Sequence, residues 1–222
     1  MGRLYDIITF DCYGTLIDWE GGITGAFIDR AARDGLVLGR DAIIDAYHSV
    51  EPEVESETYR SYREVLTETA FRVAQKVGWK LADADAVFLA ESLPRWKPFP
   101  DTNPALERLV ASGHALAILS NVDDALIAET MRHFTVGFDF VVTAQQVRSY
   151  KPAHPHFEKG REKTSGRRWL HAAQSYFHDV VPARDLGIPV AWVNRKGEPP
   201  SGETKPDREL RTLTELAEWL SR

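Results

Sequence analysis

Residues 4–16 read LYDIITFDCYGTL, and this stretch decides the fold. A short apolar run rich in β-formers ends at Asp11, and Gly14 follows three residues later. Such a run is typical of a buried strand that enters a tight loop. The sequence therefore predicts a first strand whose carboxyl end presents Asp11.

The second half of the chain alternates between the strand and helix patterns. We expect strands at residues 115–120, 138–143, 170–175 and 189–193, the last of the sheet. Between them we expect helices at residues 125–133 and 155–163 and a helical turn at 182–186. Strands that alternate with helices indicate a parallel sheet covered on both faces.

Residues 19–96 have the texture of helices instead. Apolar residues recur at helical spacing in 23–31, 41–47, 59–77 and 83–93, while the acidic segment 51–57 is interrupted by Pro52. A proline-rich hinge follows at 98–104. We therefore predict an α/β fold with a Rossmann-like core, residues 1–17 and 98–222, and an inserted helical cap, residues 18–97.

The composition of the 222 residues narrows the function classes. Hydrophobic residues make up 43%, charged residues 27%, and the net charge is −6 without a long run of Lys and Arg. Nucleic acid is therefore not an expected partner. No apolar stretch approaches the ~20 residues of a membrane span, and the apolar run after the N-terminus is too short and too acidic for a signal peptide. Cys12 is the single cysteine, so no intrachain disulfide forms, and we expect a cytoplasmic protein.

Polar residues stand where the predicted strands end, which is where sites lie in parallel sheets. Asp11 could act as a nucleophile, and Asp179 as a general base or metal ligand. Lys151 could neutralise Asp11, and Ser120 with Asn121 could hold an anion. Each residue alone also fits an ordinary role, as a loop aspartate, a helix cap or a solvated lysine.

Together these segments resemble the four motifs of the haloacid dehalogenase superfamily. The matching segments are 10–16, 119–121, 150–152 and 171–179. The likeness covers nearly the whole chain, because the helical insert also resembles the cap of that superfamily. Phosphatases of the superfamily carry a second aspartate where this chain has Tyr13. They usually carry a further aspartate, which binds magnesium, where this chain has Gln174. The aspartate that Tyr13 replaces protonates a leaving alkoxide, whereas a halide leaves without an acid. The neutral amide of Gln174 would weaken a binding site for a hard cation such as magnesium.

At both positions the chain instead resembles the L-2-haloacid dehalogenase branch, which works without metal. The resemblance implies that Asp11 attacks the halogen-bearing carbon and that water then hydrolyses the aspartyl ester. It implies that Lys151, Thr15 and Ser120 support Asp11, that Asp179 activates the water, and that Asn121 contacts the halide. The substrate-binding residues that we expect are Cys12, Tyr13, Trp19, His48, Arg63, Asn121, Ser175 and Tyr176.

The chain also departs from that branch. The dehalogenases carry an arginine on the first long cap helix, where this chain has Tyr47 or His48. Arg60 or Arg63 could replace it, whereas a neutral histidine lacks the fixed charge and the fork of donors. The dehalogenases have a water-holding serine and asparagine where this chain has Gln174 and Tyr176, and a tyrosine where it has Phe157. We interpret His154 and His156 as solvated loop residues.

The first hypothesis is hydrolysis of a short 2-haloalkanoic acid without a cofactor. One alternative is a phosphatase that holds magnesium through Asp11, Tyr13 and Asp179. Another is a hydrolase that opens a C–N bond of a small carboxylic acid, and a third is a silent module that only binds a ligand. The expected partner is a small carboxylate, and the helices permit a homodimer.

Overall fold

A computed structural model describes residues 3–221. Six parallel strands among these residues form one sheet. The strands are β1 (Ile7–Phe10), β2 (Ala115–Ser120), β3 (Phe140–Thr143), β4 (Trp169–Ala173), β5 (Val190–Val193) and β6 (Arg208–Leu210). Their order is β3-β2-β1-β4-β5-β6, so β1 lies between β2 and β4. All four residues of β1 are buried, as a strand with neighbours on both sides and helices on both faces requires. The predicted fold class is confirmed.

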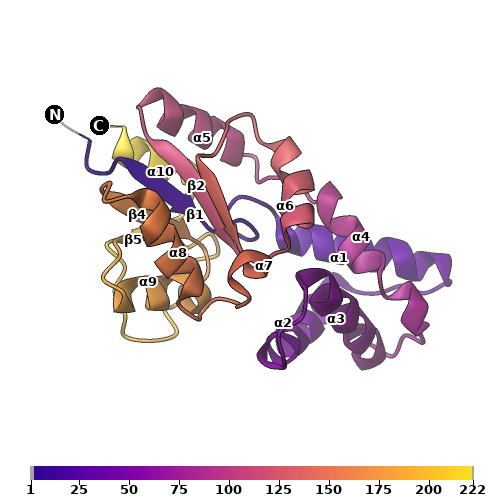
Figure 1. The fold of residues 1–222 in the computed structure, drawn as a ribbon. Coiled ribbons are helices and arrows are strands. Elements are labelled where there is room, and N and C mark those ends of the chain that lie inside the picture. Colours follow the sequence, from indigo (N-terminus) through magenta and orange to yellow (C-terminus); the bar gives the residue numbers. More distant parts are fainter. Residues whose placement is uncertain (1–2, 222) are drawn as a thin grey trace. The chain divides into compact units, whose positions relative to one another are not determined.

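Helices cover both faces of this sheet (Figure 1). On one face α5 (Thr102–Ala111) packs against α10 (Leu213–Leu220), and on the other lie α8 (Pro155–Thr164) and α9 (Val181–Asp185). Side chains alternate across the strands, so Ile7, Ala117 and Leu119 face the α8 side in one apolar cluster. Two short elements follow strands, α7 (Ala144–Val147) after β3 and the π-helix η4 (Tyr176–Val180) after β4.

The loop after β1 turns the chain back onto the end of that strand. The amides of Leu16 and Ile17 donate to the carbonyl of Cys12 over 2.8 and 3.0 Å. Gly14 makes the turn possible with a φ of 100°, a conformation that side chains oppose. The side chain of Thr15 therefore returns beside Asp11.

The remaining helices form a second compact unit, residues 19–97 and 122–131. Its elements are α1 (Trp19–Arg33), α2 (Arg40–Ser56), α3 (Tyr62–Lys76), η1 (Asp83–Asp85), α4 (Phe88–Ser92), η2 (Leu93–Arg95) and α6 (Asp124–Thr130); η3 (Met131–His133) follows. Phe27, Trp79 and Phe88 pack edge to face or tilted, with ring centroids 5.0–6.3 Å apart. Ser61 and Glu64 form a capping box that begins α3.

The first unit holds the sheet and consists of residues 1–18, 98–121 and 132–222. The contacts thus group residues 122–131 with the helices, whereas our domain assignment places them in the core. As a division into functional domains, that assignment stays a prediction. Within the described residues no helix is long and apolar enough to cross a membrane.

Several predicted elements were wrong in detail. Helix α2 continues through Pro52, since Tyr47, Val50 and Val54 are buried along it and offset the lost hydrogen bond. The predicted helix at 83–93 is instead η1 and α4, with η2 beginning at Leu93. Residues 189–193 are not the last strand, because β6 and α10 follow them.

Candidate active site

Asp11 follows β1 directly and is 7% exposed. Its amide donates to the carbonyl of Ala172 on β4 over 3.2 Å. The hydroxyl of Thr15 donates to Oδ2 of Asp11 over 2.9 Å and accepts from the amide of Gln174 over 2.9 Å. Two neighbouring strand ends thereby fix this carboxylate.

Lys151 is the centre of the site. Its buried Nζ lies 2.9 Å from Oδ1 of Asp11, 2.6 Å from Oδ1 of Asp179 and 3.0 Å from the carbonyl of Leu119. An ammonium group has three hydrogens, so each has an acceptor. The side chain of Asn121 holds the backbone of Lys151, accepting from its amide over 2.7 Å and donating to its carbonyl over 3.1 Å.

Two carboxylates and one ammonium group share this buried space, and their pKa values separate. Burial raises the pKa of Asp11, and the charge of Asp179 adds to this, against the opposing effect of Lys151. Burial also acts to raise the pKa of Asp179, but Lys151 and His171 lower it more. Burial opposes the charge of Lys151, yet both carboxylates raise its pKa. On acidification the first proton therefore goes to Asp11.

Two buried oxygen atoms of this site have no hydrogen-bond partner among residues 3–221. They are Oγ of Ser120 and Oδ2 of Asp179. Buried polar atoms are rarely unpaired in folded proteins. Unpaired atoms at the carboxyl ends of the strands are therefore suited to bind a substrate or a water molecule. The predicted catalytic residues Asp11, Thr15, Lys151 and Asp179 are joined by hydrogen bonds, and Ser120 ends the adjacent strand β2.

The predicted binding residues of the core differ in what they contact. Cys12 is fully buried, and burial raises the pKa of its thiol. Ser175 caps η4 by accepting from the amide of His178 over 3.0 Å. The ring of Tyr176 packs on Trp192, and its hydroxyl donates to the carbonyl of Thr204 over 2.7 Å. Tyr13 is partly exposed in the loop after Asp11.

Trp19, His48 and Arg63 belong to the helical unit. The ring of Trp19 lies beside those of Tyr47 and His48, with centroids 5.6 and 5.5 Å away. The guanidinium-bearing side chain of Arg63 is exposed. At the predicted place of the missing arginine, Tyr47 is instead buried and donates to Oε1 of Glu51 over 2.8 Å. The roles of these residues stay predictions.

One interpretation of the sequence was wrong. His156 is not a solvated loop residue: it lies in α8, fully buried, and contacts the carbonyl of Ser120 over 3.1 Å. Burial and the charge of Lys151 lower its pKa to about 3. The sequence reasoning also missed His171, whose Nε2 lies 2.9 Å from Oδ1 of Asp179. A polar residue inside an otherwise apolar strand was the available signal.

The donor set does not fit a magnesium ion. In residues 3–221 no group of three or more His, Cys, Asp and Glu side chains could hold a metal. The ammonium group of Lys151 contacts Oδ1 of both Asp11 and Asp179, and Gln174 supplies a neutral amide where a third carboxylate would be needed.

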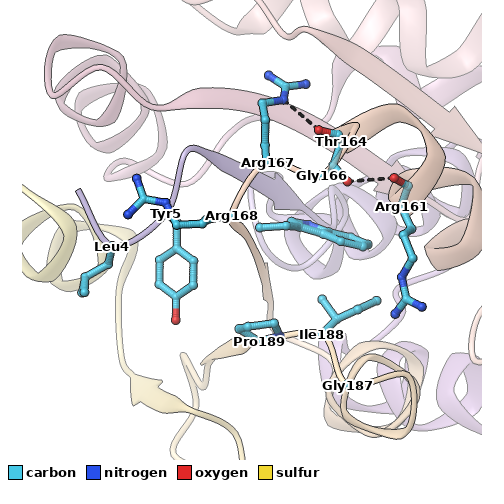
Figure 2. A pocket seen from close by; sticks show the side chains of 11 residues that line it. Leu4, Tyr5, Arg161, Thr164, Gly166, Arg167, Arg168, Gly187, Ile188 and Pro189 are labelled. Carbon is cyan, nitrogen blue, oxygen red and sulfur yellow. Dashed lines mark hydrogen bonds between the residues drawn. The ribbon is translucent and has the colours of Figure 1, made fainter. Parts of the chain in front are cut away.

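A pocket of about 380 Å³ lies at the opposite end of the sheet, where the strands β1, β4 and β5 begin (Figure 2). Trp169, Ile188 and Pro189 line it together with Tyr5. Its arginines already serve the fold: Arg168 pairs with Asp6, Arg167 with Asp139, and Arg161 donates to the carbonyl of Leu186. This pocket is therefore not the candidate active site.

Comparison with known proteins identifies the family. Residues 5–195 match the profile of the haloacid dehalogenase-like hydrolases. The chain is 31% identical over 224 residues to (S)-2-haloacid dehalogenase H-109 of Pseudomonas putida, covering 96% of both proteins. The chain belongs to the haloacid dehalogenase-like hydrolases. It is also 26% identical to haloacetate dehalogenase H-2 of Moraxella sp. (strain B), over 86% of this chain and 87% of that one.

Solved structures of this family have the same fold. The L-2-haloacid dehalogenase of Xanthobacter autotrophicus matches with a TM-score of 0.80 and 20% identity, over 96% of this chain and 97% of that chain. The same enzyme with chloropropionic acid covalently bound matches with a TM-score of 0.78. The expected resemblance to the haloacid dehalogenase superfamily and its L-2-haloacid dehalogenase branch is confirmed.

Proposed function

We propose that this hydrolase is a 2-haloacid dehalogenase that cleaves the carbon–halogen bond of a short (S)-2-haloalkanoic acid. The observation that carries the proposal is the carboxylate of Asp11, fixed by Lys151 and Thr15 at the carboxyl edge of the sheet. The names of its relatives, (S)-2-haloacid dehalogenases, support the substrate class.

The proposed first step is a displacement at carbon. A carboxylate oxygen of Asp11 attacks C2 of the substrate, a C–O bond forms, and the halide leaves with the electrons of the C–X bond. The residue two places after Asp11 is Tyr13, so no carboxylic acid stands there to protonate a leaving group. A halide departs without a proton, whereas the alkoxide of a phosphate ester needs one.

The proposed second step hydrolyses the aspartyl ester. Asp179 takes a proton from water, and the oxygen attacks the ester carbonyl carbon of Asp11. Lys151 stabilises the negative charge that develops there, since its ammonium group already contacts Oδ1 of Asp11. The product is a 2-hydroxy acid, and no metal or other cofactor takes part.

The substrate carboxylate needs hydrogen-bond donors at the site. Oγ of Ser120 is buried with no partner among the described residues, so its hydroxyl can donate. We propose that it binds the substrate carboxylate or the carbonyl oxygen of the ester.

The test is halide release from (S)- and (R)-2-chloropropionate, with and without EDTA. We expect chloride from the (S) enantiomer alone, unchanged by EDTA, and no chloride from Asp11→Asn. Intact mass spectrometry of a rapidly quenched reaction should show the ester on Asp11. No halide from a panel of chloro-, bromo- and fluoroacids would overturn the proposal, as would magnesium-dependent release of phosphate from phosphate esters.

A single turnover in water labelled with oxygen-18 tests the two-step route. If water attacks the carbonyl of the ester, the label enters Asp11 and the first product molecule carries none. If water displaces the halide directly, the product carries the label at once. The second result would contradict the nucleophilic role of Asp11.

A further inference from the structure

A line of buried polar groups ends on Oδ1 of Asp179. Nε1 of Trp169 lies 2.7 Å from Oγ1 of Thr9, which lies 2.8 Å from Nδ1 of His171. Nε2 of His171 lies 2.9 Å from Oδ1 of Asp179. Thr9 and His171 are fully buried and pair in register across β1 and β4. The relay of Trp169, Thr9 and His171 therefore begins in the sheet and ends on a catalytic carboxylate.

The chemistry of the two end groups fixes a hydrogen at each end of this relay. An indole N–H can only donate, so Oγ1 of Thr9 accepts from Trp169. Among residues 3–221 the one other partner of this hydroxyl is Nδ1 of His171, 2.8 Å away. Oδ1 of the Asp179 carboxylate can only accept, so Nε2 of His171 carries a hydrogen and donates it over 2.9 Å. The ring is also packed edge to face against Phe157, with centroids 5.2 Å apart.

This arrangement makes the two oxygens of Asp179 unequal. Oδ1 accepts from His171 over 2.9 Å and from Lys151 over 2.6 Å. Oδ2 is buried and has no partner in the described part of the chain. An oxygen that already accepts two strong donors is a poor base, whereas the other oxygen keeps its lone pairs for a water molecule.

We propose that His171 is a positioning residue for ester hydrolysis: it holds Oδ1 of Asp179 so that Oδ2 alone faces the hydrolytic water. This inference rests on the proposed function. The water passes a proton to Oδ2 while its oxygen bonds to the carbonyl carbon of Asp11. The acyl C–O bond then breaks, the departing alkoxide takes the proton from Oδ2, and Asp11 is left as the acid, which releases its proton to solvent.

The role belongs to the second step only. Displacement of the halide uses Asp11 and not Asp179, so removal of the His171 donor should leave the first step unchanged. The His171→Leu variant lacks both ring nitrogens at a similar size. We expect it to form the ester and release the first equivalent of halide at the normal rate, and to hydrolyse the ester roughly 10- to 100-fold more slowly. The ester should accumulate in intact mass spectra.

The His171→Gln variant is the matched control. Its side-chain amide can donate to Oδ1 of Asp179 from about the place of Nε2, so we expect most of the hydrolysis rate to return. A merely structural role of His171 would slow both steps or neither, and would not be rescued by glutamine. Equal rates of ester hydrolysis in the wild type and His171→Leu would overturn the proposal.

A measurement on the resting protein needs no substrate. The nitrogen-15 resonances of His171 should show a hydrogen on Nε2, the atom that lies 2.9 Å from Oδ1 of Asp179. A ring with its hydrogen on Nδ1 would overturn the inference, even if His171→Leu did not fold. If the wild type released no halide from any haloacid, the proposed function would fail, and this spectrum would still decide the hydrogen positions of the relay.

Discussion

Nζ of Lys151 lies 2.6 Å from Oδ1 of Asp179, and both side chains are 1% exposed. The same Nζ contacts Asp11, so one buried ammonium group balances two carboxylates. Removing the ammonium in Lys151→Met would leave two like charges in a buried space. We expect loss of turnover by at least ~100-fold and destabilisation by about 3–5 kcal/mol, since a charge loses its buried partner.

Halide release and urea unfolding measure these two effects. Lys159→Met is the control, because its exposed ammonium group pairs with Glu162 at the surface and contributes about 0–1 kcal/mol. A Lys151→Met protein with wild-type turnover would remove Lys151 from the mechanism.

The raised pKa of Asp11 predicts the acid limb of the pH profile. Asp11 attacks as the carboxylate, so the rate of ester formation falls as the pH falls through its pKa. Burial raises that pKa above the ordinary value of 3.8, so the limb should lie at a higher pH than for an exposed aspartate. Asp179 has a lowered pKa and stays ionised there.

Rapid-quench halide release between pH 3 and 8 gives this profile. Circular dichroism at each pH separates titration from unfolding. A limb at or below the ordinary value of 3.8 would contradict the raised pKa of Asp11.

Arg63 is the residue that the sequence suggests for assisting the departing halide. Arg60 is the matched control, since its guanidinium already pairs with Glu57. We expect Arg63→Gln to slow release of chloride more than release of bromide, because the poorer leaving group needs more stabilisation. Arg60→Gln should leave both rates within about twofold. Unchanged rates in Arg63→Gln would exclude Arg63 from this role.

Asp123 stabilises the start of α3 within the helical unit. Its Oδ1 and Oδ2 accept from the amides of Tyr62 and Arg63, each over 2.8 Å. These amides lack partners inside their own helix, as at every helix N-terminus. We expect Asp123→Ala to cost about 1–2 kcal/mol in urea unfolding, and Asp123→Asn less, since its amide oxygen still accepts. Equal stability of Asp123→Ala and the wild type would contradict this role.

The sequence predicted the parts of the site that follow strands. Asp11, Ser120, Lys151 and Asp179 each lie at or after a strand that a mainly apolar run predicted. Their companion His171 was not predicted. Its partner Thr9 comes from a distant segment that strand pairing places beside it, and Asp179 reaches it only through the fold of η4. The polar residue inside an apolar strand was a local signal, but it does not show which residues are its partners.

The missed elements have other reasons. Strand β6 has three residues, of which only Leu210 is buried, so its pattern is too short to read. Helix α10 did leave a signal, since Thr212 and Glu215 form a capping pattern before a strongly apolar face. Pro52 was given too much weight as a breaker, because burial of Val50 and Val54 outweighs a local preference.

Two glycines of α1 predict opposite changes in stability. A Cβ at Gly22 would lie 2.2 Å from Cγ of Trp96, a distance that no real contact allows. The indole of Trp96 is buried and donates to Oγ of Ser92 over 2.9 Å, so it has no room to move. We therefore expect Gly22→Ala to destabilise the protein by about 1–3 kcal/mol through overpacking.

Gly25 lies one turn further along the same helix, and a Cβ there would meet nothing within 4 Å. Gly25→Ala should stabilise the protein by roughly 0.5–1 kcal/mol, since alanine loses less backbone freedom in a helix. Urea unfolding of both variants measures the difference. Because helix propensity favours alanine equally at both positions, a stabilised Gly22→Ala protein would mean that the side chain of Trp96 does not occupy the space beside Gly22.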